Sequence, residues 1–162
     1  MRPTAWLVLS LALLPQCTAS RGSPSDAGPA ASIARPRYGA VMTEIGRRFE
    51  LAGRAAKAKR FELAAFEVGE LEEAFDDELP SAKLPKEGPT ASLPAMAEAF
   101  AKTHPAALAT AARAEDGPAF AEAFRQASAT CNACHEASGH AFIKVPAAPG
   151  MSVPDLEPIA AP

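Results

Sequence analysis

Four segments of the chain repeat apolar side chains every three or four residues, and this period limits the fold more than any other feature. The segments begin near Tyr38, Phe61, Leu93 and Phe120. A repeat of this length places apolar side chains on one face of a helix. Because the connections between the segments are mostly short, successive helices should run in opposite directions. The sequence therefore predicts an all-α fold, an antiparallel four-helix bundle with disordered N- and C-terminal tails.

Proline and glycine fall mainly where the predicted helices begin and end. Pro94 and Pro118 occupy first-turn positions, and Gly139 lies just past the last helix. Pro105 is the exception, because it lies inside the third pattern and predicts a kink or a division of that helix. The composition is rich in alanine and poor in β-branched residues, which favours helices. The net charge of −3 does not indicate a nucleic-acid-binding protein.

Residues 1–19 have the pattern of a secretory signal peptide. A single basic residue precedes an apolar run, residues 5–14, which is shorter than a helix that spans a bilayer. Cleavage after Ala19 would release the mature chain. A bacterial lipoprotein signal, with a lipid on Cys17, is the alternative. We expect export to the periplasm, with membrane anchoring only if Cys17 is lipidated.

Composition divides the rest of the chain. Residues 20–36 are rich in serine, glycine, proline and alanine and lack an apolar period, so we expect a disordered linker. The helical patterns occupy residues 37–145, the predicted bundle domain. Residues 146–162 are rich in proline and predict an extended tail.

The segment Thr130 to His140, TCNACHEASGH, carries the only concentrated chemistry in the sequence. Cys131 and Cys134 continue the apolar face of the fourth helix, and His135 follows directly. The order Cys-x-x-Cys-His is the attachment signature of c-type haem. Two thiols add to the haem vinyl groups, and the adjacent imidazole binds the iron as proximal ligand. This chemistry takes place outside the cytoplasm, in agreement with an export signal.

Three other interpretations of this segment remain open. A zinc site needs about four ligands, and these three residues would need His104 or His140 as well. A redox dithiol of the thioredoxin type belongs at a helix N-terminus beside strands, whereas this motif lies near the C-terminal end of a helix. Two buried thiols beside a surface histidine would leave a haem-free structural bundle.

An exported four-helix bundle with Cys-x-x-Cys-His near the end of its last helix resembles cytochrome c′ and its low-spin relatives. The segments Arg60–Phe75 and Thr130–Val145 also resemble a group of small bacterial haem-binding bundle proteins of ill-defined role. The resemblance covers most of residues 37–145. It implies one covalent haem c on Cys131 and Cys134, with His135 on the iron.

The distal side of the iron decides between electron transfer and gas binding. In the low-spin relatives, a methionine of the first helix is the distal ligand, often a few residues after an arginine. Met42 lies as deep in the first helix as Cys134 lies from the end of the antiparallel fourth helix, which makes it our first candidate. Met96 is the next candidate. Arg37, which precedes Met42, is a candidate contact for a haem propionate.

Other side chains receive broader expectations. His104 lies too far along the third helix to reach the iron and is expected as a capping or core histidine beside Pro105. His140 is expected near the haem edge or in solvent. Five phenylalanines are candidates for packing on the haem or filling the core: Phe49, Phe66, Phe75, Phe100 and Phe124. The acidic run Glu70–Glu78 lies near the motif end of the bundle and would steer a basic redox partner protein. A homodimer is compatible with this type of fold.

The sequence thus predicts a periplasmic one-electron carrier with a single covalent haem, and not an enzyme. The first alternative is a five-coordinate haem protein that binds nitric oxide or carbon monoxide. The second is a haem-free bundle with a thiol pair.

Overall fold

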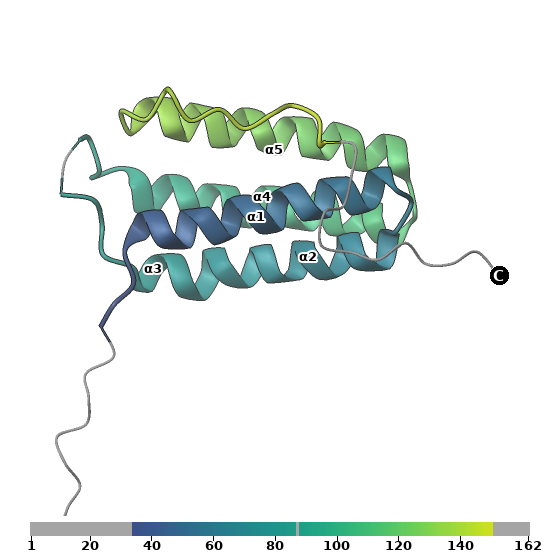
Figure 1. The fold of residues 1–162 in the computed structure, drawn as a ribbon, viewed down its shortest axis with the longest axis horizontal. Coiled ribbons are helices and arrows are strands. Elements are labelled where there is room, and N and C mark those ends of the chain that lie inside the picture. The colour runs from purple at the N-terminus through teal and green to yellow at the C-terminus, as the bar shows by residue number, and fades with distance from the viewer. Residues whose placement is uncertain (1–33, 87, 151–162) are drawn as a thin grey trace, which may run out of the picture. The chain divides into compact units, whose positions relative to one another are not determined.

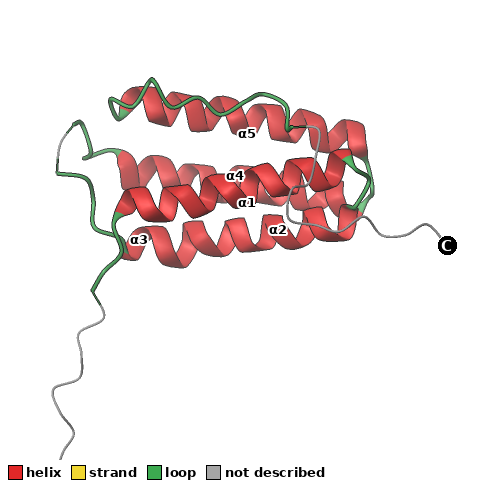
Figure 2. Cartoon of the chain, viewed as in Figure 1, coloured by secondary structure: helices red, strands yellow, loops and turns green. Residues whose placement is uncertain are grey.

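The computed structural model describes residues 34–86 and 88–150, and these form the predicted all-α bundle (Figure 1). Within these ranges the chain is built from helices and loops, and a single β-bridge joins Arg37 to Lys83 (Figure 2). The predicted signal peptide, the Cys17 lipidation site, and most of the linker and tail lie outside the described residues. The helices are α1 Tyr38–Lys57, α2 Phe61–Glu73, the π-helical turn η1 Ala74–Glu78, α3 Leu79–Ser81, α4 Leu93–Arg113 and α5 Gly117–Ala137.

Two tight turns make the helices antiparallel. Each turn contains a residue with positive φ two positions after the helix: Lys59 after α1, with φ of 58°, and Glu115 after α4, with φ of 53°. After each, backbone N–H groups donate to carbonyls of the last helical turn, as in a Schellman motif, although neither residue is glycine. The Asp116 carboxylate then caps α5 by accepting a hydrogen bond of 2.9 Å from Ala119 N–H.

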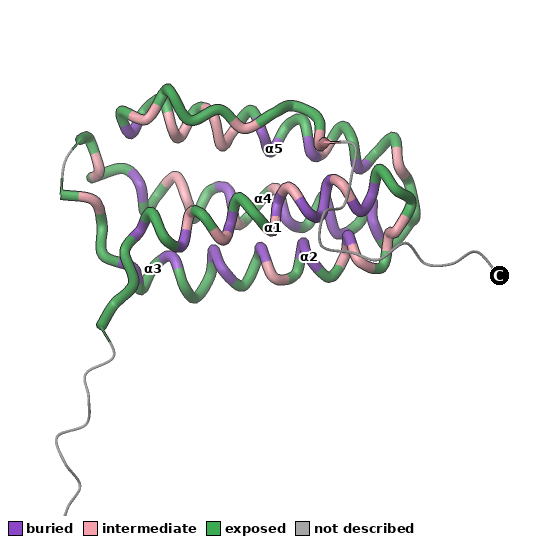
Figure 3. Tube along the Cα trace, in the orientation of Figure 1, coloured by how far each residue is buried: buried purple, intermediate pink, exposed green. Residues whose placement is uncertain are grey.

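Small side chains let the helices approach closely. The buried residues form one continuous core along the bundle (Figure 3), in which alanines alternate with a few large groups. Ala52, Ala55 and Ala64 are fully buried beside Val68 and Leu71. α1 packs more extensively against α2 than against α5. The seam between α1 and α5 is therefore the looser side of the bundle.

Pro105 does not divide the third long helix, so the prediction that the helix is divided there is wrong. α4 continues from Leu93 to Arg113 through Pro105. Proline removes one helical hydrogen bond at this point. Pro105 is nevertheless fully buried, and Leu108 and Ala109, in the next turn, are buried too. Core packing therefore holds the helix together across the missing bond.

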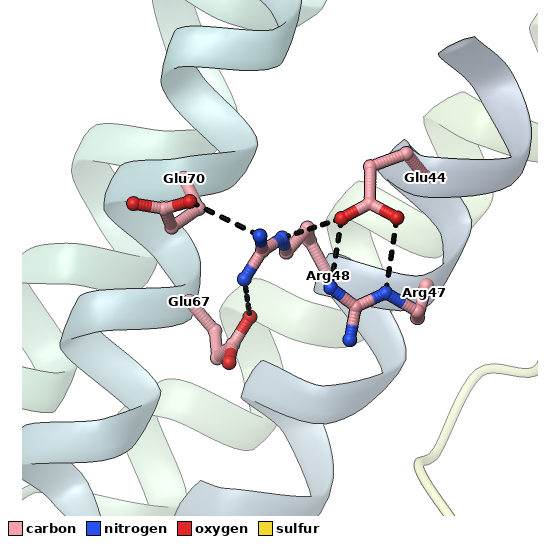
Figure 4. Close-up of polar contacts among 5 residues, drawn as sticks. All are labelled: Glu44, Arg47, Arg48, Glu67 and Glu70. Carbon is pink, nitrogen blue, oxygen red and sulfur yellow. Dashed lines mark hydrogen bonds and ion pairs between the residues drawn. The ribbon is translucent and has the colours of Figure 1, made fainter.

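An ion-pair network joins α1 to α2 (Figure 4). The Arg48 guanidinium contacts Glu67 at 3.0 Å, Glu70 at 3.1 Å and Glu44 at 2.7 Å. The Glu67 side chain is only 9% exposed, so its charge depends on this partner. The network fixes the register of α1 on α2.

After α5 the chain turns back and runs along the same helix as an irregular segment, which we call the C-terminal strap (residues 139–150; Figure 1). Gly139 makes the reversal with φ of 79°. The far end of the strap is fixed where Gly150 N–H donates to the Glu50 carboxylate at 3.1 Å. A Cβ on Gly53 would lie 2.5 Å from the Phe124 ring and 2.8 Å from Pro149, so only glycine allows the strap this close. Among the described helices, none combines the length and apolarity needed to cross a membrane.

Candidate functional site

Cys131, Cys134 and His135 lie on the last two turns of α5 and are all half-buried. Both cysteines are free thiols. They reach this position because the apolar repeat of α5 continues through them: Phe124 and Ala127 precede Cys131 on the same buried face. The motif therefore faces the bundle interior, as the sequence predicts.

Two cavities flank the motif. The first has a volume of about 170 Å³ and separates Cys134 from residues of α1, η1 and α4. The second has a volume of about 300 Å³ and is closed on one side by strap residues 144–146. Four side chains border both cavities: Met42, Phe100, Cys131 and His135. The remaining walls are mainly apolar.

The imidazole of His135 is held by the strap. Its Nδ1 lies 3.2 Å from the carbonyl oxygen of Ile143. A carbonyl oxygen only accepts hydrogen bonds, so Nδ1 carries the proton and donates it. In the neutral ring Nε2 then keeps its lone pair free for a metal ion. A metal-binding histidine is commonly oriented by such a bond from its other nitrogen.

The two thiols are neutral. Burial, with a smaller contribution from Cys134, raises the pKa of Cys131 from 9.0 to about 12. Burial also raises the pKa of Cys134. A redox dithiol requires a stabilised thiolate, usually at a helix N-terminus, whereas these thiols are in an apolar wall near a helix C-terminus. The surroundings therefore suit covalent anchoring of an apolar group better than thiol–disulfide exchange.

Met42 and Met96 both reach the site from opposite helices. Each is half-buried, and both border the first cavity. Only Met42 also borders the second cavity, together with Cys131 and His135. Met42 therefore lies opposite the motif across the seam between α1 and α5, and Met96 approaches from α4.

Arg37 is exposed at the start of α1 and does not border either cavity. Arg35 lines an adjoining cavity of about 390 Å³, which shares Tyr38 and Phe75 with the first cavity. The Arg35 guanidinium donates hydrogen bonds to the carbonyls of Ser81 at 2.6 Å and Ala82 at 3.4 Å. Arg35 was not a sequence candidate, because it falls within the predicted linker.

The phenylalanines divide between the core and the surface. Phe75 and Phe100 stack with ring centroids 4.5 Å apart and border the first cavity. Phe49 and Phe124 stack at 4.1 Å further along the seam. Phe66 is 57% exposed, so the expectation that it fills the core or packs at the site is wrong for the isolated chain. It lies off the apolar stripe of α2.

The two other histidines lie outside the set of candidate ligands. His104 is half-buried on α4, and its ring contacts Phe100 with centroids 4.9 Å apart. Burial lowers its pKa, as expected of a histidine in an apolar environment. His140 lies on the strap, where its Nδ1 is 3.2 Å from the Ser138 hydroxyl. Neither residue borders the two cavities beside the motif.

A larger cavity lies elsewhere. It has a volume of about 650 Å³ at the opposite end of the bundle, where Phe61, Phe120 and Pro149 line it with Lys57 and Lys59 on its rim. It contains no cysteine, histidine or methionine. The chemistry of the chain therefore points to the two smaller cavities, in spite of their size.

Within residues 34–86 and 88–150, no three histidine, cysteine or acidic side chains gather closely enough to bind a metal ion directly. A haem does not require such a group, because the porphyrin nitrogens supply the equatorial ligands. The residues present fit a haem: two thiols and one free imidazole nitrogen on one helix, a thioether opposite, and phenylalanine walls. Comparisons of the chain with models of protein families, with curated proteins and with solved structures give no match.

Proposed function

We propose that this protein is a monohaem c-type cytochrome of the bundle type, a one-electron carrier of the periplasm and not an enzyme. One observation carries the proposal: Cys131, His135 and Met42 border the same two cavities, and the Ile143 carbonyl leaves His135 Nε2 free. When bound, the haem would supply an iron that changes oxidation state by one electron.

Each residue of the site has a distinct role in this proposal. Cys131 and Cys134 would hold the haem through thioether bonds, and His135 Nε2 would bind its iron. The Met42 thioether would be the second protein ligand of the iron, with Met96 as the alternative. Phe100, which borders both cavities, would pack against the haem and exclude water from it.

The proposed partner is a basic redox protein that docks at the motif end of the bundle. Phe75 and Leu79 border the first cavity, so the turn between them lies beside the site. Its acidic residues are exposed, as are those that precede it: Glu72, Glu73, Asp76, Asp77 and Glu78. A cluster of one charge sign next to the site would attract a partner of opposite charge.

The test is to produce the full chain with a periplasmic haem-attachment system and to measure its denatured mass and its ferric and ferrous spectra. We expect a mass increase of one haem that survives denaturation, and a low-spin spectrum. The matched control is Cys131→Ala with Cys134→Ala, which should lose the covalent haem. A high-spin spectrum that shifts with carbon monoxide would instead support gas binding. An unchanged mass would support the haem-free bundle and overturn the proposal.

A further inference from the structure

One asparagine inside the Cys-x-x-Cys-His motif, Asn132, joins the C-terminal strap to α5 by two hydrogen bonds. The Asn132 side chain makes two hydrogen bonds to the backbone of one strap residue: Nδ2 donates to Val145 O at 2.9 Å, and Val145 N–H donates to Oδ1 at 2.8 Å. Asn132 thus pairs with the strap as a neighbouring strand would. It is the only asparagine in the chain.

This pair lies next to the contact that orients His135. Val145 is two residues from Ile143, whose carbonyl accepts the hydrogen bond from His135 Nδ1 at 3.2 Å. Along α5, His135 follows Asn132 by three residues, so both side chains project toward the strap from neighbouring turns. Within the strap, Ile143 N–H donates to the His140 carbonyl at 2.8 Å, a local turn that presents the Ile143 carbonyl.

The other anchors of the strap lie further from the histidine. Ser128 donates to the Pro146 carbonyl at 2.9 Å, one helical turn before Asn132. Gly150 N–H binds Glu50 on α1, and Lys57 approaches the Pro149 carbonyl at 3.4 Å. Asn132 is therefore the anchor closest to Ile143, and the position of the Ile143 carbonyl depends on it most directly.

From this arrangement we propose that Asn132 is a positioning residue, which fastens the strap so that the Ile143 carbonyl holds the His135 proton on Nδ1 and leaves Nε2 free toward the cavities. This role deepens the proposed function and rests on it for its purpose. The bond also makes the ring a stronger donor to a metal ion, because the carbonyl draws on the Nδ1 proton. The strap, which forms a wall of the second cavity through residues 144–146, would close the site at the same time.

The experiment compares the full chain with Asn132→Ala by nuclear magnetic resonance. In Asn132→Ala the Val145 amide loses its acceptor, and its exchange with solvent should become at least about tenfold faster. In haem-free protein the proton of neutral His135 should shift from Nδ1 to Nε2, the tautomer that histidine favours in water. In haem-loaded protein, exchange of the His135 Nδ1 proton should accelerate instead.

Two control variants isolate the effect. Gln126→Ala changes another amide side chain on α5 that hydrogen-bonds Glu122, and it should alter neither signal. Ser128→Ala removes only the contact with Pro146 and should affect His135 less than Asn132→Ala. If Asn132→Ala fails to fold, Val145→Pro serves as the second variant. It removes the bond from Val145 N–H to Asn132 Oδ1 from the strap side, and the same change at His135 is expected.

Two outcomes would overturn the inference. A Val145 amide that stays protected in Asn132→Ala would mean that other contacts hold the strap. Faster Val145 exchange with an unchanged His135 ring would mean that Asn132 fastens the strap without positioning the histidine. Neither outcome depends on covalent haem, which the mass of the wild-type chain reports separately, so failure of this inference and failure of the proposed function are distinguishable.

Discussion

Between α1 and α5, the stacked rings of Phe49 and Phe124 join the two helices in one half of the seam, whereas in the other half Met42 and Cys131 border the two cavities beside the motif. The same two helices form both halves. The difference therefore comes from the side chains that face each other, because methionine and cysteine fill less space than two phenylalanines. We call the half with Phe49 and Phe124 the closed half and the half with Met42 and Cys131 the open half. The closed half can hold the helices at a fixed separation, and this leaves the open half available to a cofactor.

The closed half should carry most of the stability of the seam. Phe124 is 1% exposed and stacks on Phe49. We expect Phe124→Ala to lower the free energy of unfolding by about 3–5 kcal/mol, since it removes a large buried ring and leaves a void. Urea denaturation of the haem-free chain measures the change. The control Phe66→Ala, at an exposed ring, should stay within about 0.5 kcal/mol; equal losses from both variants would contradict the assignment of Phe124 as a core anchor.

A contact on the other side of α1 tests whether the seam with α2 is held differently. Arg48→Ala should lower the free energy of unfolding by about 2 kcal/mol, because it leaves the Glu67 carboxylate buried without its partner. The same denaturation measurement applies. Arg125→Ala, which breaks a fully exposed pair with Glu122, should lower the free energy of unfolding far less than Arg48→Ala. A similar effect of the two variants would mean that the Arg48 network adds little to the α1–α2 contact.

The open half should be less sensitive to loss of a side chain. Met42 already borders two cavities, so we expect Met42→Ala to lower the free energy of unfolding by about 1 kcal/mol, less than for a methionine in a filled core. In haem-loaded protein the same variant should convert a low-spin spectrum to a high-spin one. Met96→Ala should leave the spectrum unchanged. If Met96→Ala removes the low-spin spectrum instead, Met96 is the distal ligand.

The open half also buries ionisable groups, so the stability of the haem-free protein should fall at high pH. Burial, with a smaller contribution from Cys134, raises the pKa of Tyr38 from 10.0 to about 12. Because the folded state binds this proton more tightly, its contribution is complete below pH 10.0 and is lost as pH rises toward about 12. The raised pKa of the Cys131 thiol has the same effect, so its contribution to stability should be lost as pH rises above 9.0. Tyr38→Phe should reduce the loss between pH 10.0 and about 12; an unchanged pH profile would show that Tyr38 is solvated.

Much of this comparison could be predicted from the sequence. Periodicity predicted four helices and placed Met42 opposite the Cys-x-x-Cys-His motif, because both predictions depend on local spacing. The expected division of the third long helix at Pro105 is wrong, because burial of Pro105, Leu108 and Ala109 outweighs the missing hydrogen bond. Phe66 was retained as a core candidate on residue type alone, although its position on α2 turns it outward.

The strap could not be predicted, for a physical reason. Its contacts join side chains of α5 to backbone carbonyls and one amide of an irregular segment. Backbone groups are the same in every residue, so such contacts leave no pattern in the sequence. The sole sign in the sequence is the polar amide of Asn132 between the two cysteines, on a helix that is rich in alanine.

The smallest expected effect concerns where a partner docks. If the acidic residues beside the first cavity steer a basic partner, the rate of electron transfer should fall a few-fold as ionic strength rises through the physiological range. Asp76→Asn with Asp77→Asn should flatten this dependence, measured by stopped-flow reduction with a basic redox protein. Lys57→Gln with Lys59→Gln changes charge at the opposite end of the bundle, beside the cavity of about 650 Å³. If this control alters the salt dependence as much as the acidic variant, the partner is steered by the overall charge of the protein, and the open half of the seam is not its specific docking end.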